Sequence, residues 1–180
     1  MKIKLSEISF ISKTEEQQLL VDFNNRNVKY PRDKTIVDLF QEQAAKAPDR
    51  IAVTTGKDML SYGELNRQSN QVASFLKKQG AGREQIVALL ADRSPEMIVS
   101  ILGVLKAGAA YLPIDPDYPE ERISYMLEDS GAGSLIVQHP EDVPARYSGR
   151  VISLWEREWE KEDSSDLEGE ACPDDLAYII

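Results

Sequence analysis

The middle of the chain alternates short apolar runs with longer segments that carry apolar residues at helical spacing. Residues 86–91, 110–114 and 134–137 are nearly continuous apolar runs, which are typical of strands covered on both faces. Between these runs, residues 95–106 and 119–131 carry apolar side chains at intervals of three and four. Short strands that alternate with helices predict parallel βαβ units, and therefore an α/β fold.

Two further amphipathic helices are predicted ahead of this region. Residues 36–47 have apolar positions at helical spacing after Thr35, which is a favourable N-cap residue. Ser61 is followed three residues later by Glu64, the arrangement of a capping box. A second helix is therefore expected over residues 62–79.

The first thirty residues form a separate lead-in. Thr14 and Gln17 have capping-box spacing and predict the start of a short helix. A stretch rich in asparagine and other turn-forming residues then leads to Pro31, which disfavours helix in the residue before it. We therefore expect a linker over residues 1–30 and one domain over residues 31–180.

The pattern weakens after Pro140. Residues 156–175 contain ten acidic residues against one arginine and one lysine, which favours a solvated loop or a mobile surface excursion. Residues 176–180 are again apolar, and a final strand is predicted there.

Composition limits the classes of function. Hydrophobic residues make up 42% and charged residues 29% of the 180 residues, as in soluble globular proteins. The net charge of -10 disfavours nucleic acid and anionic membrane surfaces as partners. No apolar stretch reaches the roughly 18 residues of a membrane span, and the N-terminus lacks the apolar core of a signal peptide. A cytoplasmic location is expected.

Few residues suggest chemistry. The sequence contains no GxxxxGK[ST], GxGxxG, CxxC, HExxH or GxSxG motif. Cys172 and His139 are the single residues of their type and have no companion with disulfide, metal-ligand or triad spacing. Asp115 and Asp117 flank a proline, which favours a turn over a calcium loop. We therefore assign no catalytic, cofactor-binding or metal-ligating residue.

Three segments resemble core motifs of the adenylation domains of nonribosomal peptide synthetases. Residues 60–66, LSYGELN, are similar to the first motif. Residues 105–115, LKAGAAYLPID, match the second motif at every defining position and continue as these domains do. Residues 173–180, PDDLAYII, resemble the lead-in to the third motif, a Ser/Thr/Gly-rich loop with a lysine. That loop is not among the 180 residues.

The resemblance implies part of the large N-terminal subdomain of an adenylate-forming enzyme. Such an enzyme uses ATP and magnesium to convert an amino acid into an aminoacyl adenylate, and loads it onto the phosphopantetheine thiol of a carrier domain. A condensation domain upstream and a peptidyl carrier domain downstream are the implied partners. In this family the catalytic and substrate-pocket residues lie beyond residue 180. The chain alone is therefore expected to be an inactive scaffold.

Two alternatives remain at this point. The chain could derive from a stand-alone acyl- or aryl-CoA ligase, although the linker-like residues 1–30 disfavour this. It could also be a non-catalytic module whose first helix docks on a neighbouring domain.

Overall fold

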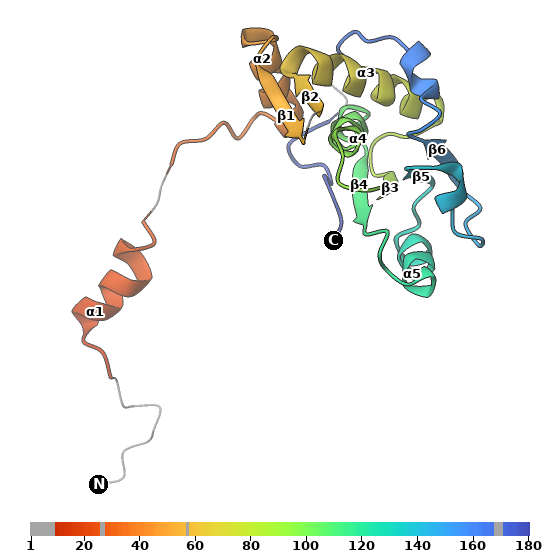
Figure 1. Cartoon of the computed structure of the whole chain (residues 1–180). Coiled ribbons are helices and arrows are strands. Elements are labelled where there is room, and N and C mark those ends of the chain that lie inside the picture. Colours follow the sequence, from red (N-terminus) through yellow and green to blue (C-terminus); the bar gives the residue numbers. More distant parts are fainter. Residues whose placement is uncertain (1–9, 26–27, 57, 168–170) are drawn as a thin grey trace. The chain divides into compact units, whose positions relative to one another are not determined.

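The computed structural model describes residues 10–25, 28–56, 58–167 and 171–180 (Figure 1). The chain divides into two compact units, Met1–Pro31 and Arg32–Ile180. None of the described helices is long and apolar enough to cross a membrane.

The first unit contains the short helix α1 (Lys13–Gln17). Its N-cap is Ser12, whose hydroxyl accepts from the backbone N–H of Glu15, while the Glu15 carboxylate accepts from the backbone N–H of Ser12 at 2.8 Å. The capping box predicted at Thr14 and Gln17 is therefore wrong by two residues. A glutamate at the third helical position also carries the negative charge that a helix N-terminus favours, which glutamine lacks.

The helix α1 continues directly into one turn of π-helix, η2 (Gln18–Asp22). The apolar side chains in this turn and directly after it are largely exposed. Leu19, Leu20 and Phe23 are 49%, 65% and 60% exposed. Among its described residues, the first unit therefore has no buried apolar core.

The second unit is built on a parallel sheet of four strands in the order β4-β3-β5-β6. These strands are β3 (Ile86–Leu90), β4 (Ala110–Ile114), β5 (Ser134–Val137) and β6 (Arg150–Ser153). All neighbouring pairs are parallel, so the predicted βαβ units are confirmed. The sequence pattern missed β6, because only the second half of this edge strand is buried and its apolar signal is short.

Helices cover both faces of this sheet (Figure 1). The helices α3 (Tyr62–Lys78) and α4 (Pro95–Lys106) pack on one face, and α5 (Glu120–Ser130) packs on the other. Successive residues of the central strand β3 alternate between the two cores. Val87 and Leu89 join the core beneath α3 and α4, and Ala88 and Leu90 join the core beneath α5.

The remaining elements surround this framework. The helix α2 (Ile36–Lys46) is followed by an antiparallel hairpin of β1 (Ile51–Thr55) and β2 (Asp58–Ser61). Two 3₁₀ turns, η3 (Pro140–Asp142) and η4 (Glu158–Lys161), flank β6.

Helix ends follow the predicted local signals. The hydroxyl groups of Thr35, Ser61 and Ser94 accept backbone N–H groups at the starts of α2, α3 and α4. Gly108 and Gly131 have φ angles of 79° and 64°, in the left-handed region that glycine adopts at little cost. The chain therefore turns sharply out of α4 into β4, and out of α5 towards β5.

The acidic segment agrees with its prediction only in part. Residues 158–167, which we call the strap, pack along α3, and Trp159 is only 1% exposed. Side chains of α3 donate to strap carbonyl oxygens: Asn70 Nδ2 to Ser164 at 2.8 Å and Gln71 Nε2 to Glu160 at 2.6 Å. Most strap residues are exposed, as predicted for a solvated loop, but the contacts that fix the strap on α3 were not predicted. The polar side of α3 and one buried indole hold the strap despite its charge.

The predicted strand over residues 176–180 is reduced to a single parallel bridge between Tyr111 and Tyr178. The backbone N–H of Tyr111 donates to Ala177 O at 3.1 Å, and the backbone N–H of Ile179 donates to Tyr111 O at 3.0 Å. These two bonds place the segment beside β4, but they are too few to define a strand.

We predict that Gly103→Ala destabilises the second unit by about 1–3 kcal/mol. A Cβ atom at Gly103 on α4 would lie 2.5 Å from Val72 Cγ1 on α3, so the two helices would have to separate. Urea unfolding should show the loss. The matched control is Gly82→Ala, because a Cβ there meets no atom within 4 Å. Equal unfolding midpoints for the two variants would contradict this packing.

Candidate functional site

The three family-like motifs meet in the folded unit. Lys106 of the second motif, 3% exposed, donates through Nζ to Asn66 Oδ1 of the first motif at 2.6 Å. The same nitrogen donates to Asn70 Oδ1 at 2.6 Å and to Asn66 O at 3.2 Å. Tyr111 of the second motif packs on Tyr178 of the third, with ring centroids 5.7 Å apart. The motifs therefore contact one another through side chains as well as through the sheet.

The Lys106 ammonium group has a complete set of partners. Its three N–H donors match three oxygen acceptors, and its nitrogen lies 5.3 Å from the centroid of the Phe40 ring on α2. Burial lowers the pKa of Lys106 to about 8, and the nearby Asp166 carboxylate opposes this shift. The geometry fits a protonated lysine, since a neutral amine would turn its lone pair towards an oxygen.

Asp166 of the strap completes the network from the other side. Its Oδ1 accepts from Asn66 Nδ2 at 2.8 Å and from Asn70 Nδ2 at 2.9 Å. Partial burial alone would raise the pKa of the Asp166 carboxyl. The hydrogen bonds from Asn70 and Asn66 and the charge of Lys106 outweigh burial and lower this pKa. Each amide thus presents its oxygen to the cation and its nitrogen to the anion.

This network was not predicted from the sequence. Two signals were present: a lysine at the end of the most apolar helix, and two asparagines four residues apart on the helix that packs against it. Asp166 gave no such signal, because it lies among many other acids in a segment without periodicity.

The carboxyl edge of the sheet contains a crevice of about 230 Å³. It lies where the connections after β3 and β4 leave towards opposite faces, the place where open α/β sheets commonly bind ligands. Buried Leu90 and Ile123 supply its apolar part, and exposed Asp92 and Asp142 with half-buried His139 supply its polar part.

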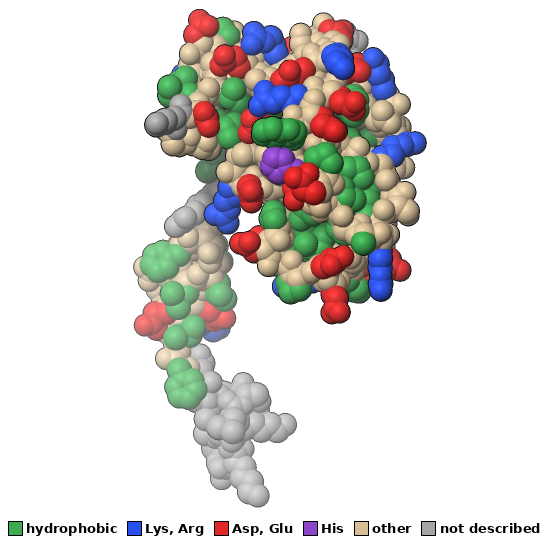
Figure 2. Space-filling view, turned by 45° about the vertical axis from the view of Figure 1, so that its right-hand side comes forward, with side chains coloured by type: hydrophobic (Ala, Val, Ile, Leu, Met, Phe, Trp, Pro, Cys, Tyr) green, Lys and Arg blue, Asp and Glu red, His purple; other side chains and the backbone are tan. Residues whose placement is uncertain are grey.

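His139 lies near the middle of one face of the molecule, among acidic and apolar side chains (Figure 2). Its ring packs on the ring of Trp155, with centroids 5.2 Å apart, and its backbone N–H donates to Asp142 Oδ2 at 2.9 Å. In the part of the chain that the structure describes, no three histidine, cysteine or acidic side chains are grouped to bind a metal. Cys172 is exposed and free.

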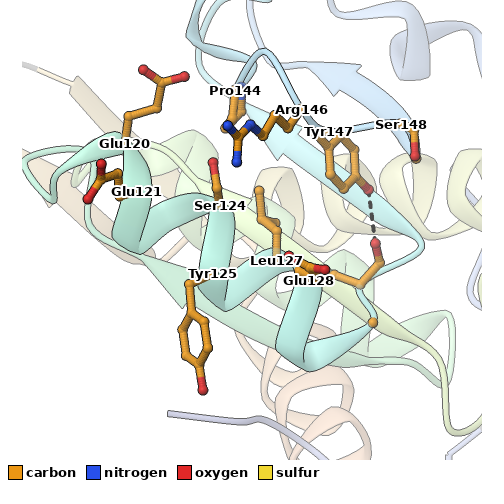
Figure 3. A pocket seen from close by; sticks show the side chains of 13 residues that line it. Glu120, Glu121, Ser124, Tyr125, Leu127, Glu128, Pro144, Arg146, Tyr147 and Ser148 are labelled. Carbon is orange, nitrogen blue, oxygen red and sulfur yellow. Dashed lines mark hydrogen bonds between the residues drawn. The ribbon is translucent and has the colours of Figure 1, made fainter.

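A larger, open groove of about 1040 Å³ runs between α5 and residues 144–149 (Figure 3). Three glutamates, Glu120, Glu121 and Glu128, line it from α5, and Arg146 lies on the opposite side. Tyr147 closes one end, where its hydroxyl donates to Ala132 O at 3.1 Å. Burial raises the pKa of Tyr147 to about 12, so this hydroxyl remains a donor at neutral pH.

Neither hollow suits a triphosphate. The groove presents three carboxylates against one guanidinium, and the crevice presents two carboxylates. Phosphate binding requires converging N–H donors or cations. Asp115 and Asp117 form a local turn, in which the backbone N–H of Asp117 donates to Asp115 Oδ1 at 3.0 Å. The described residues of this chain therefore do not by themselves fit ATP and magnesium.

The parallel sheet, its covering helices and the joined motifs define a class of protein. The chain belongs to the AMP-binding enzyme family, which its sequence matches over residues 40–180. Within that family it is a segment of a nonribosomal peptide synthetase adenylation domain.

Curated relatives support this assignment along nearly the whole chain. Gramicidin S synthase 2 of Brevibacillus brevis is 48% identical over 179 residues, which are 99% of this chain and 4% of that protein. Bacitracin synthase 3 of Bacillus licheniformis is 47% identical over 176 residues, which are 98% of this chain and 3% of that protein. The chain thus spans only a small part of these relatives.

Solved structures show the same fold. The nonribosomal peptide synthetase FmoA3 in its AMPPNP-bound form matches with a TM-score of 0.82 and 26% identity, over 91% of this chain and 18% of that chain. The N-terminal subdomain of NpsA from Klebsiella oxytoca matches with a TM-score of 0.74 and 28% identity, over 83% of this chain and 39% of that chain.

We predict that Lys106→Met destabilises the second unit by about 1–3 kcal/mol, because it leaves buried amide oxygens without donors. Urea unfolding at pH 7 measures this loss. Lys78→Met is the matched control: Lys78 lies on the adjacent helix, its side chain is 68% exposed, and it forms an ion pair with Glu162. The control should lose under about 1 kcal/mol. If the Lys106→Met protein is as stable as the wild type, the network makes no net contribution to the free energy of unfolding.

Proposed function

We propose that this chain supplies scaffold to the large subdomain of an adenylation domain, and that the intact domain activates an amino acid with ATP. The product would be an aminoacyl adenylate, which is then transferred to the phosphopantetheine thiol of a carrier domain. The observation that carries the proposal is the joining of the three motifs around Lys106 and Tyr111, in a chain 48% identical to a peptide synthase. Since ATP is a cytoplasmic substrate, we place the parent protein in the cytoplasm.

The scaffold role follows from what the reaction needs. A carboxylate that attacks the α-phosphate of ATP brings anions together, so donors and cations must hold them in place. Magnesium would supply part of that charge when bound. This chain instead contributes a net charge of -10 and no glycine-rich phosphate loop in its sequence. Its residues position the strands of the sheet, and we expect the phosphate-binding loop to lie at the carboxyl edge of these strands.

The alternative of a CoA ligase has less support, because the curated relatives described above are peptide synthases. The docking alternative applies to the first unit alone. Its exposed apolar side chains, Leu19, Leu20 and Phe23, are suited to pack on a neighbouring domain. We propose a condensation domain as that neighbour, and a peptidyl carrier domain as the downstream partner.

We predict that the 180-residue chain alone does not catalyse amino-acid-dependent exchange of pyrophosphate into ATP. When the chain replaces the matching segment of gramicidin S synthase 2 in an excised active domain, exchange should remain within about tenfold of the unmodified domain. The physical reason is that the replaced segment would supply packing, while the reacting groups lie elsewhere in the domain.

Two controls make this test decisive. Circular dichroism and a urea transition must show that the chimera is folded. Exchange above background by the isolated chain would refute the scaffold role, and a folded but silent chimera would refute the shared function.

A further inference from the structure

The strap is attached to α3 by a row of side chains. Asn66, Asn70, Ser74 and Lys78 fall at intervals of four residues, so they share one side of the helix. Asn66 Nδ2 donates to Asp166, Ser74 Oγ donates to Asp163 O at 3.2 Å, and Lys78 pairs with Glu162. Much of this attachment uses strap carbonyl oxygens. These bonds join the strap to α3 and not to a strand of the sheet, so breaking them would leave the strand pairing intact.

The closed strap is not fully satisfied. The indole Nε1 of Trp159 is buried and has no hydrogen-bond partner among the described residues. A buried donor without a partner destabilises the closed form, and this cost is removed when opening lets water accept its hydrogen bond. Apart from Trp159, only the partly buried Leu167 anchors the strap in the apolar core. Segments with few buried apolar anchors open locally more readily than core strands.

Lys106 lies beneath the strap, and every neighbouring element contributes to its surroundings. The helix α3 presents the amides of Asn66 and Asn70, α2 presents the ring of Phe40, and the strap presents the Asp166 carboxylate. The negative charge of Asp166 raises the pKa of Lys106 and so opposes the effect of burial. Opening would remove that carboxylate and let water reach the ammonium group.

We propose that the strap opens from α3 as a unit while the sheet stays folded, and that Lys106 couples this opening to proton uptake. The coupling follows from hydration. The closed form strips water from the lysine side chain and so disfavours its charged state, whereas the open form restores that water.

The sign of the pH dependence follows from linkage. In the closed form, burial lowers the pKa of Lys106 from 10.5 to about 8. Above pH 8 the open form therefore holds more protons, so raising the pH favours closure, by at most about tenfold per pH unit. Below pH 8 both forms hold the proton, and Lys106 contributes no further change. Asp166 contributes at acidic pH. Its pKa is lowered in the closed form, so the closed form loses stability as the pH falls through the pKa of Asp166 in that form.

The two tryptophans provide the measurement. Trp159 is 1% exposed and Trp155 is 70% exposed, so the Trp155 indole N–H is an internal reference for the intrinsic pH dependence of exchange. NMR on the full chain should give the ratio of the two indole exchange rates from pH 6 to 9.5. Protection of Trp159 should stay flat up to about pH 8 and then rise several-fold per pH unit, while β3 amides stay more protected throughout.

Three variants test the role of Lys106. Lys106→Met should abolish the rise. Asp166→Asn removes the charge that raises the pKa of Lys106, so the rise should begin at a lower pH in a strap that keeps its amide contacts. Lys78→Met removes a lysine from the same helix side and should leave the rise in place. Circular dichroism checks that each variant is folded.

Several results would overturn the proposal. One is a Trp159 protection ratio that stays flat in the wild type. Another is an unchanged rise in a folded Lys106→Met protein. Equal protection and equal pH dependence for Trp159 and the β3 amides would show that opening is global unfolding. If Lys106→Met does not fold, Asp166→Asn alone decides whether Lys106 is coupled to opening. An onset of the Trp159 protection rise at the same pH as in the wild type would then overturn the proposal.

Discussion

An ammonium group that loses its water requires a full set of oxygen acceptors, and in the second unit this constraint falls on Lys106. The lysine lies at the end of α4, 3% exposed, in the core beneath one face of the sheet. The acceptors come from α3. The compensating carboxylate is that of Asp166 in the strap, sixty residues after Lys106 in the sequence. Satisfying one cation therefore fixes the relative positions of two helices and a segment without regular structure.

The network also explains two of the motif residues in physical terms. Asn66 ends the first motif, and Lys106 stands near the start of the second. Gly103, one turn before Lys106, lets α4 approach α3 closely at Val72, which brings the lysine within reach of both asparagines. Gly108 then turns the chain into β4 with a φ angle of 79°. These residues make contacts within the second unit.

Local signals predicted the fold wherever one strong pattern dominated. The three apolar runs became adjacent parallel strands, and Thr35, Ser61 and Ser94 began helices as expected. Prediction failed where stability comes from contacts distant in sequence. The strap has the composition of a solvated loop, yet it is hydrogen-bonded to Asn70 and Gln71, which precede it by about ninety residues in the sequence. The edge strand β6 was missed because pairing with β5 compensates for a weak apolar pattern.

The candidate site divides in the same way. Capping by Glu64 and the turn at Asp115 could be predicted, since both depend on neighbours within three residues. The pairing of Lys106 with Asn66 could not, because no periodicity specifies which polar residue of α3 faces which residue of α4. A buried lysine in an apolar helix does imply that oxygen acceptors face it. The two asparagines four residues apart on α3, Asn66 and Asn70, are therefore candidate acceptors, but their pairing with Lys106 and the anion from the strap required the folded structure.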